Sequence, residues 1–294
     1  MFSKGRVLVT GCTGYIGSHT VKALKREGFE VHGIDIDRQS PNDVRKYVDK
    51  LMFGDAYDFT WAYRYDAVVH LAAFISVEES VSKPLEYFHN NTMGTHWQLH
   101  FNGTNGCENF VFASTAGAFD PVSPYAQSKL MAESLVKNMA KNYTIFRFFN
   151  VAGNDGEFRQ TGNATHLIRI AAETAAGKRP SMNLYGTDWD TPDGTCVRDY
   201  IHVMDLVDAI VKAVYNPKNT PYECIGSGKG YSCREVIDTM KRVSGKDFEV
   251  NDAPRRAGDP AIISIPVGQK KSGYIQCKRT LEDMCLSAYN MELR

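Results

Sequence analysis

The chain has 294 residues, of which 43% are hydrophobic and 23% charged, and its 34 basic and 34 acidic side chains give a formal net charge of +0. A chain of this length buries a large core without a metal or disulfide staple, and balanced charge gives no attraction for nucleic acid or an anionic membrane. No uncharged apolar run reaches about 18 residues, which argues against a membrane span. The seven cysteines form no C-x-x-C pair, so we expect free thiols, a cytoplasmic protein and no metal site.

Short apolar segments in the first half of the chain have the composition of buried strands. They are RVLVTG (6–11), FEVHGID (29–35), DAVVHLA (66–72), NFVFAS (109–114) and TIFRFFN (144–150). Each is rich in Val, Ile or Phe and apolar on both faces, and helix-length segments separate them. This alternation predicts an α/β fold of the Rossmann type, a doubly wound parallel sheet.

The pattern changes after residue 153, where loops lengthen and strands become scattered. We therefore predict a first domain over 1–153 and a smaller C-terminal α/β substrate lobe over 154–294. Within this lobe Ser232 and Glu235 form a capping box before a helix that ends at Gly245.

The stretch VLVTGCTGYIGSH follows the first predicted strand directly. Gly11, Gly14 and Gly17 allow a tight turn, a close approach of pyrophosphate to the backbone and close packing of the next helix. The second strand ends at Asp35, where a carboxylate accepts hydrogen bonds from an adenosine ribose and repels a 2'-phosphate. The sequence therefore predicts a dinucleotide site that favours NAD. The alternative is a glycine-rich turn followed by a surface acid.

Tyr125 and Lys129 lie four residues apart in SPYAQSK. Ser123 is a good N-cap and Pro124 suits the first helical position, so Tyr125 is expected in a first helical turn with Lys129 on the same face. A nearby ammonium favours the phenolate, and we expect it to lower the pKa of Tyr125 toward neutrality, where the phenol works as a general base. Tyr274 and Lys278 have the same spacing but no cap before them, so we assign them to packing.

Several motifs together resemble one family. TGCTGYIGSH, HLAA, NNTMGT, SPYAQSK, FRFFNVAG and GTCVRDYIHVMDL are similar to those of the extended short-chain dehydrogenase/reductases, and most closely to the UDP-galactose 4-epimerases among them. The resemblance runs nearly end to end. It implies a Rossmann lobe to which residues 199–216 return, bound NAD, a UDP-sugar substrate, inversion at C4 through a 4-keto sugar, and a homodimer.

The resemblance also implies roles for individual residues. Tyr125 would take the proton of the sugar 4-hydroxyl, Lys129 would bind the nicotinamide ribose, and Thr115 would orient the proton. The implied cofactor residues are Gly11, Thr13, Gly14, Tyr15, Ile16, Gly17, Asp35, Ile36, Asp55, Ala56, Leu71, Ala72, Ala73, Asn91, Ser114, Tyr125, Lys129 and Phe149. The implied substrate residues are Thr115, Asn150, His166, Leu167, Asn183, Leu184, Tyr185, Arg198, Arg256 and Asp259.

Some of these assignments have alternatives. Arg255 adjoins Arg256 and could bind in its place, and Ser114 could share the role of Thr115. His166 could be an exposed residue at a helix start. His202 is expected to be structural, because it lies inside a predicted strand.

The sequence also departs from the family pattern. AFDPV (118–122) replaces a longer loop, and Ile262 stands where some epimerases have a tyrosine that restricts them to unacetylated sugars. An N-acetylated UDP-sugar or a UDP-pentose is therefore an alternative substrate. A dehydratase is disfavoured because Ala116 and Gly117 follow Thr115 where an acidic pair would be needed. A C6 dehydrogenase is disfavoured because it needs a nucleophilic cysteine, and Cys12 in the glycine turn is the one cysteine that we find beside the motifs. A non-catalytic NAD-binding protein is the third class of alternative.

Overall fold

The computed structural model describes residues 4–56, 63–162, 165–256 and 259–294. The chain forms two compact units, one of residues 1–148 and 207–223 and one of residues 149–206 and 224–294. None of the helices in these described ranges combines the length and hydrophobicity that a membrane crossing requires.

The first unit is built around a parallel sheet. Its strands are β1 (Arg6–Thr10), β2 (Glu30–Asp35), β3 (Lys50–Phe53), β4 (Ala67–His70), β5 (Asn109–Thr115) and β6 (Tyr143–Phe148). The order is β6-β5-β4-β1-β2-β3, with β10 (Glu223–Ile225) next to β6, so seven strands are described in this sheet. The five predicted strands are confirmed, and β3 and β10 are additions to them.

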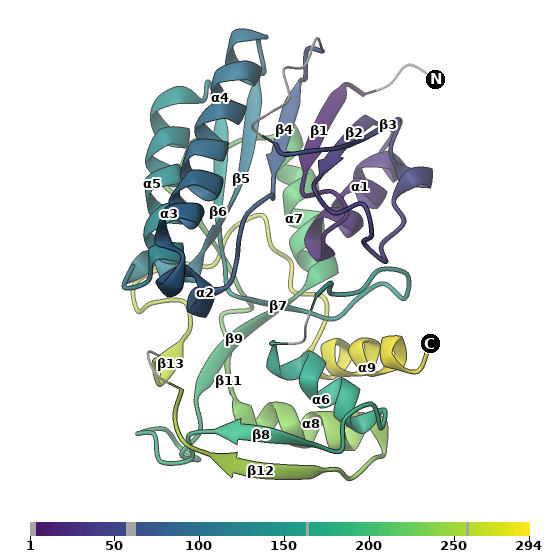
Figure 1. The fold of residues 1–294 in the computed structure, drawn as a ribbon, viewed down its shortest axis with the longest axis vertical. Helices are drawn as coiled ribbons and strands as arrows, with labels where there is room; N and C mark the ends of the chain where they lie inside the picture. Colours follow the sequence, from purple (N-terminus) through teal and green to yellow (C-terminus); the bar gives the residue numbers. More distant parts are fainter. Residues whose placement is uncertain (1–3, 57–62, 163–164, 257–258) are drawn as a thin grey trace. The chain divides into compact units, whose positions relative to one another are not determined.

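Helices cover the strands of this unit. They are α1 (Tyr15–Arg26), α2 (Val77–Ser82), α3 (Pro84–Tyr87), α4 (Gly94–Thr104) and α5 (Pro124–Met139), with short turns of other helical types at Arg45–Tyr47, Phe88–Met93 and Ala116–Phe119. Figure 1 shows α4 and α5 side by side on one face of the sheet. Leu99 of α4 and Val136 of α5 pack there with Leu8, Val68 and Phe112 of the strands. Because successive strand residues point to opposite faces, the strands need apolar residues at nearly every position.

The order of these strands places a ligand site at one edge. The chain runs outward in opposite directions from β1 and β4, which are neighbours in the sheet. In doubly wound sheets a ligand binds outside the carboxyl ends of the strands at such a switch point. The glycine turn after β1 and the segment after β4 both lie at this edge.

The second unit contains smaller sheets and three helices in its described part. Its strands are β7 (Asn150–Ala152), β8 (Ser181–Tyr185), β9 (Val197–His202), β11 (Gly230–Ser232), β12 (Glu249–Ala253) and β13 (Ile262–Ile263), and its helices are α6 (Leu167–Ala175), α8 (Cys233–Ser244) and α9 (Leu281–Glu292). β9 pairs with β7, β11 and β13, and β8 pairs with β12. A further helix, α7 (Val203–Tyr215), begins in the second unit and continues in the first.

The helix signals read from the sequence of this unit are confirmed. α8 begins with the predicted capping box of Ser232 and Glu235 and ends at Gly245, which has a φ of 64°. Its apolar face packs on α6 and α9. His202 is buried at the end of β9, and Tyr274 is buried outside any helix, as expected for structural residues.

Candidate functional site

The glycine turn of the first unit has geometry that larger residues would not tolerate. Gly11 has a φ of +69°, and a Cβ there would lie 2.9 Å from the backbone nitrogen of Ala72. A Cβ on Gly17 would lie only 1.9 Å from the carbonyl oxygen of Gly11. The absence of a side chain at Gly11 and Gly17 therefore lets three segments approach closely: the turn after β1, the start of α1 and the segment after β4.

The N-terminus of α1 is open to an anion. Its N-cap is Gly14, no side chain caps it, and its first turn has no acidic residue. The first N–H groups of a helix lack intrahelical acceptors, and the helix dipole adds positive potential at this end. A phosphate group fits this end of the helix.

Asp35 lies beside the same turn at the end of β2. Its Oδ2 accepts from the backbone N–H of Thr13 at 2.8 Å, and its Oδ1 accepts from Asp37 at 3.0 Å. These bonds fix the carboxylate next to the glycine turn. The remaining lone pairs are available to hydroxyl donors.

The other proposed cofactor positions of the first unit follow the same edge. Tyr15 and Ile16 begin α1, Ile36 follows β2 and is exposed, and Asp55 and Ala56 follow β3. Leu71, Ala72 and Ala73 follow β4, and the N–H groups of the first two donate to Thr10 Oγ1. Phe149 belongs to the second unit, where it is buried.

Tyr125 and Thr115 are brought together by α5 and β5. α5 begins as predicted, with Ser123 as N-cap and Pro124 at the first position, and Ser123 Oγ accepts from the N–H of Ala126 at 3.2 Å. Tyr125 therefore lies in the first turn, with its hydroxyl close enough to the Thr115 side chain for Thr115 to lower the pKa of the phenol.

The prediction that Lys129 lowers the pKa of Tyr125 is wrong for this structure. Burial raises the pKa of Tyr125, and the nearby Thr115 side chain offsets only part of that rise. The Lys129 ammonium lies 4.3 Å from the centroid of the Phe112 ring and makes no hydrogen bond within the described residues. Burial lowers the pKa of Lys129 to about 7, so its charge near neutrality depends on its surroundings.

Two further predicted residues are occupied by internal contacts. Ser114 is buried and its Oγ donates to Glu133 Oε1 at 2.6 Å. Asn91 is buried too, and it hydrogen-bonds both backbone groups of Phe74 and the Ser128 hydroxyl. Asn91 thus fastens the segment after β4 to α5.

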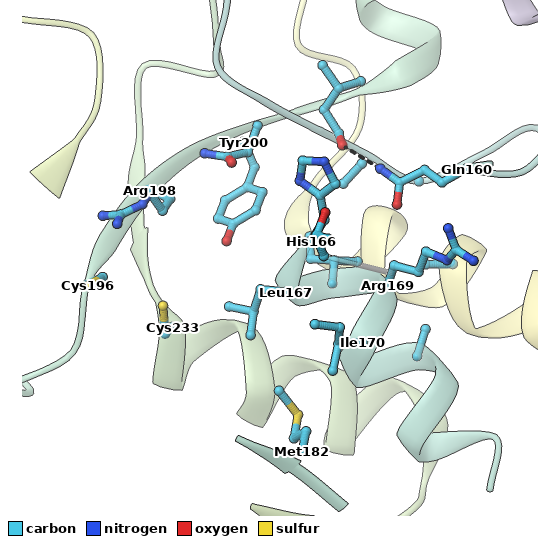
Figure 2. Close-up of a pocket in the computed structure, with 18 of the residues that line it drawn as sticks. Gln160, His166, Leu167, Arg169, Ile170, Met182, Cys196, Arg198, Tyr200 and Cys233 are labelled. Carbon is cyan, nitrogen blue, oxygen red and sulfur yellow. Dashed lines mark hydrogen bonds between the residues drawn. The ribbon is translucent and has the colours of Figure 1, made fainter. Parts of the chain in front are cut away.

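The second unit contains a cavity of about 260 Å³. It is lined from β7, α6, β8, β9 and the start of α8, as Figure 2 shows for ten labelled side chains. Every substrate residue predicted in this unit lines it: Asn150, His166, Leu167, Asn183, Leu184, Tyr185, Arg198, Arg256 and Asp259. Thr115, the remaining predicted residue, belongs to the first unit. Ile262 is exposed and is not among the lining residues, whereas Ile263 is.

Arg198 supplies a buried positive charge to this cavity. Its Nη1 donates to the carbonyl oxygens of Val197 at 2.9 Å and Ala261 at 3.2 Å, while Asp259 lies 3.6 Å from Nη2. The adjacent Asp199 does not pair with it, because its carboxylate accepts from the N–H groups of Ser227 and Gly228. Part of the Arg198 guanidinium therefore remains available to an anionic ligand.

The structure distinguishes the two adjacent arginines. Arg256 lines the cavity with its guanidinium 4.0 Å from the centroid of the Tyr185 ring. Arg255 stacks on Trp189 at 3.9 Å and donates to Asp188 at 2.8 Å, and it does not line the cavity. Only Arg256 is placed to reach a ligand there.

Sequence reasoning missed several cavity residues. Cys196 and Cys233 line it side by side, with the N–H of Cys233 donating to the carbonyl oxygen of Cys196 at 2.9 Å, and Tyr200 points into it (Figure 2). Burial raises the pKa of both thiols, to about 11 for Cys233. The alternation of residues 196, 198 and 200 along one strand was the available signal, since it places all three on one face.

Comparison with known proteins agrees with this geometry. Residues 7–225 match the profile of the NAD dependent epimerase/dehydratase family. The chain belongs to this family. One similar relative is the UDP-glucose 4-epimerase of Azospirillum brasilense. It is 39% identical to this chain, and the match covers 98% of this chain and 92% of the relative.

Solved structures of the family are also similar along the whole chain. The UDP-glucose 4-epimerase of Brucella ovis in complex with NAD gives a TM-score of 0.87 at 32% identity, covering 98% of both chains. The UDP-Glc/GlcNAc 4-epimerase of Campylobacter jejuni gives a TM-score of 0.80 at 33% identity, again covering 98% of both chains. The predicted Rossmann-type fold is confirmed for this member of the family.

Proposed function

We propose that this protein is a UDP-sugar 4-epimerase that interconverts UDP-glucose and UDP-galactose with NAD as its cofactor. The observation that carries the proposal is the approach of the Tyr125 phenol to the Thr115 side chain, with Lys129 one helical turn away on α5. A positioned phenol of this kind supplies the proton transfer that chemistry at a sugar hydroxyl requires.

The first unit fits NAD at three points. The uncapped start of α1 suits the pyrophosphate, the Asp35 carboxylate suits the adenosine ribose hydroxyls, and the Lys129 ammonium, which has no hydrogen-bond partner in the described residues, suits the nicotinamide ribose. Bound NAD would supply the hydride chemistry, in which a hydride leaves the sugar C4 and comes back to the opposite face of the carbonyl carbon. We accordingly assign the first unit as the NAD-binding Rossmann domain and the second as the nucleotide-sugar lobe.

The chain's own groups handle protons and charge. Tyr125 removes the proton of the 4-hydroxyl and gives one back, and Thr115, whose side chain lies beside the phenol, orients the proton. In the second unit Arg198 and Arg256 bind the diphosphate, and the apolar part of the cavity receives the base. Planar guanidinium groups suit a diphosphate because they donate paired hydrogen bonds.

The identity of the sugar has a second candidate. The Campylobacter jejuni relative is named for both glucose and N-acetylglucosamine substrates, which supports testing acetylated sugars here. Purified protein is incubated with UDP-galactose, UDP-N-acetylgalactosamine and a UDP-pentose, and the products are separated by chromatography. We expect UDP-glucose from UDP-galactose. Conversion of another sugar alone would transfer the proposal to that sugar, and conversion of none would contradict it.

We also propose a homodimer that forms through α4 and α5. Trp97, Met131 and Met139 are large apolar residues exposed on these two adjacent helices, and Met93 is exposed in the turn that leads into α4. Exposed apolar groups of this kind mark protein interfaces. Light scattering should give twice the chain mass for the wild type and the chain mass for Trp97→Glu/Met131→Glu, and a monomeric wild type would contradict the dimer.

A further inference from the structure

Glu133 is a fully buried carboxylate one helical turn after Lys129. Its Oε1 accepts from Ser114 Oγ at 2.6 Å and from Arg147 Nε at 2.8 Å, and its Oε2 accepts from Arg147 Nη2 at 2.8 Å. Lys137 lies 3.4 Å from Oε2 at the edge of the group. A buried carboxylate with this many partners holds them in one arrangement.

Arg147 is itself held from several sides. It projects from β6, its guanidinium lies 4.0 Å from the Tyr222 ring centroid and 4.6 Å from that of Phe119, and it forms a two-point ion pair with Glu133. Planar guanidinium groups stack on aromatic rings while donating in their plane. The ion pair therefore joins α5 to the central strands.

This network begins beside the residues proposed for catalysis. Ser114 precedes Thr115 on β5, and Lys129 and Tyr125 lie one and two turns before Glu133 on α5. A shift of α5 along β5 would separate Tyr125 from Thr115. The hydrogen bonds of Glu133 oppose that shift.

Glu133 also decides the charge around Lys129. The titratable groups of the described residues that face Lys129 are Tyr125, His70 and Glu133. Burial lowers the pKa of His70 to about 3, so this imidazole is neutral between hydroxyls of Thr10 and Thr95. Near neutral pH Glu133 is the group of this set that brings a negative charge, and that charge raises the pKa of Lys129 against the effect of burial.

We propose that Glu133 is a positioning residue for the epimerase reaction. It holds the first turns of α5 against the end of β5, and its negative charge favours the protonated form of Lys129. The reaction itself rests on the proposed function, but the charge of Lys129 is measurable without any substrate.

The test is an NMR titration of the Lys129 side chain. Protein labelled with ¹³C-lysine is titrated with pH, and the Lys129 ¹³Cε signal is assigned by its loss in Lys129→Arg. The main variant is Glu133→Gln/Arg147→Met, which removes both buried charges together because removing one would leave the other unpaired. Glu133→Asp keeps the charge with a shorter side chain. Glu30→Gln is the matched control. Glu30 makes a similar two-point pair with Arg6, but this pair lies at the N-terminal ends of β1 and β2, away from the edge of the sheet that carries the site.

We expect the Lys129 midpoint to fall by about one to two pH units in the double variant. It should keep its wild-type value in Glu30→Gln and Glu133→Asp. Turnover of UDP-galactose by Glu133→Asp should fall about tenfold or more in kcat with KM little changed, because α5 is then less well placed.

Each other outcome overturns a stated part of the proposal. If the double variant folds and its Lys129 midpoint equals that of the wild type, the charge of Glu133 has no role. A shifted Lys129 midpoint in Glu133→Asp, which keeps the charge, would refute that role as well. If the double variant does not fold, Glu133→Asp decides the positioning role, and wild-type kcat in that variant refutes it. A wild-type protein that converts no UDP-sugar refutes the proposed function, while the titration still tests Glu133.

Discussion

Ser114 and Thr115 are neighbours at the end of β5, yet their hydroxyls serve different partners. Ser114 donates to the buried Glu133, whereas Thr115 accepts from the N–H of Gly117 and lies beside the phenol of Tyr125. Glu133 and Tyr125 both belong to α5, two turns apart, and of the two hydroxyls only that of Thr115 lies beside the phenol proposed for the proton transfer.

Thr115→Val should therefore affect turnover more than Ser114→Ala does. We expect a loss of about 10²-fold in kcat for Thr115→Val, the size found when one oriented hydrogen-bonding group is removed from a reacting centre. Ser114→Ala should lower the free energy of unfolding by about 1–3 kcal/mol, because Glu133 loses a buried donor. Steady-state kinetics and urea unfolding of both variants check this. A larger kcat loss in Ser114→Ala would reverse the assignment.

Tyr125→Phe should reduce kcat by about 10²- to 10⁴-fold, since it removes the acid–base hydroxyl and leaves the ring. NAD released from the denatured variant should equal that from the wild type, because the ring and Lys129 are retained. Both are measured on the same preparations. Wild-type turnover in this variant would exclude the phenol from the reaction.

Lys129 should reduce the stability of the fold below neutral pH. Burial lowers its pKa from 10.5 to about 7, so between these values the unfolded chain binds more protons than the folded one, and stability rises with pH across that window. Below about pH 7 the full penalty is present. At pH 6 the free energy of unfolding of Lys129→Met should exceed that of the wild type by about 2–4 kcal/mol, as measured by urea unfolding. This difference in free energy should shrink toward pH 10. An equal difference at both pH values would show that this pKa is not lowered.

Arg256→Ala and Arg255→Ala form a matched pair. Arg256 lines the cavity, while Arg255 is held by Trp189 and Asp188. We expect Arg256→Ala to weaken UDP binding about 10- to 100-fold in calorimetry, the range for one charged hydrogen-bonding group, and Arg255→Ala to leave it unchanged. The reverse result would mean that the segment carrying Arg255 and Arg256 rearranges when UDP binds.

The cavity thiols give a separate test of where UDP binds. Because burial raises the pKa of Cys233 to about 11 and also raises that of Cys196, both should react slowly with iodoacetamide at pH 7. Saturating UDP should slow the reaction further at these two positions and not at the exposed Cys277. Peptide mass spectrometry measures each site, and unchanged rates with UDP would place the nucleotide elsewhere.

The sequence was informative wherever one local signal determined the structure. Ser123 and Pro124 start α5 and so place Tyr125, and Asp35 ends β2 beside the glycine turn. The charge of Lys129 was not predictable, because it depends on Phe112, His70 and Glu133, which three different elements contribute. Similarly, Cys196 and Cys233 meet only because β9 pairs with β11, and pairing between distant segments leaves no local pattern.

The commitment of Asp199 to the turn at Ser227 and Gly228 has a consequence for selectivity. If that carboxylate faced its neighbour, Arg198 would meet a second acid in addition to Asp259, and the second unit would have less positive charge to offer a phosphorylated compound. Because the Asp199 carboxylate points elsewhere, the Arg198 guanidinium favours a ligand that carries a phosphate. Free hexoses have no phosphate to offer it, so they would compete poorly for this lobe even where they are abundant in a cell.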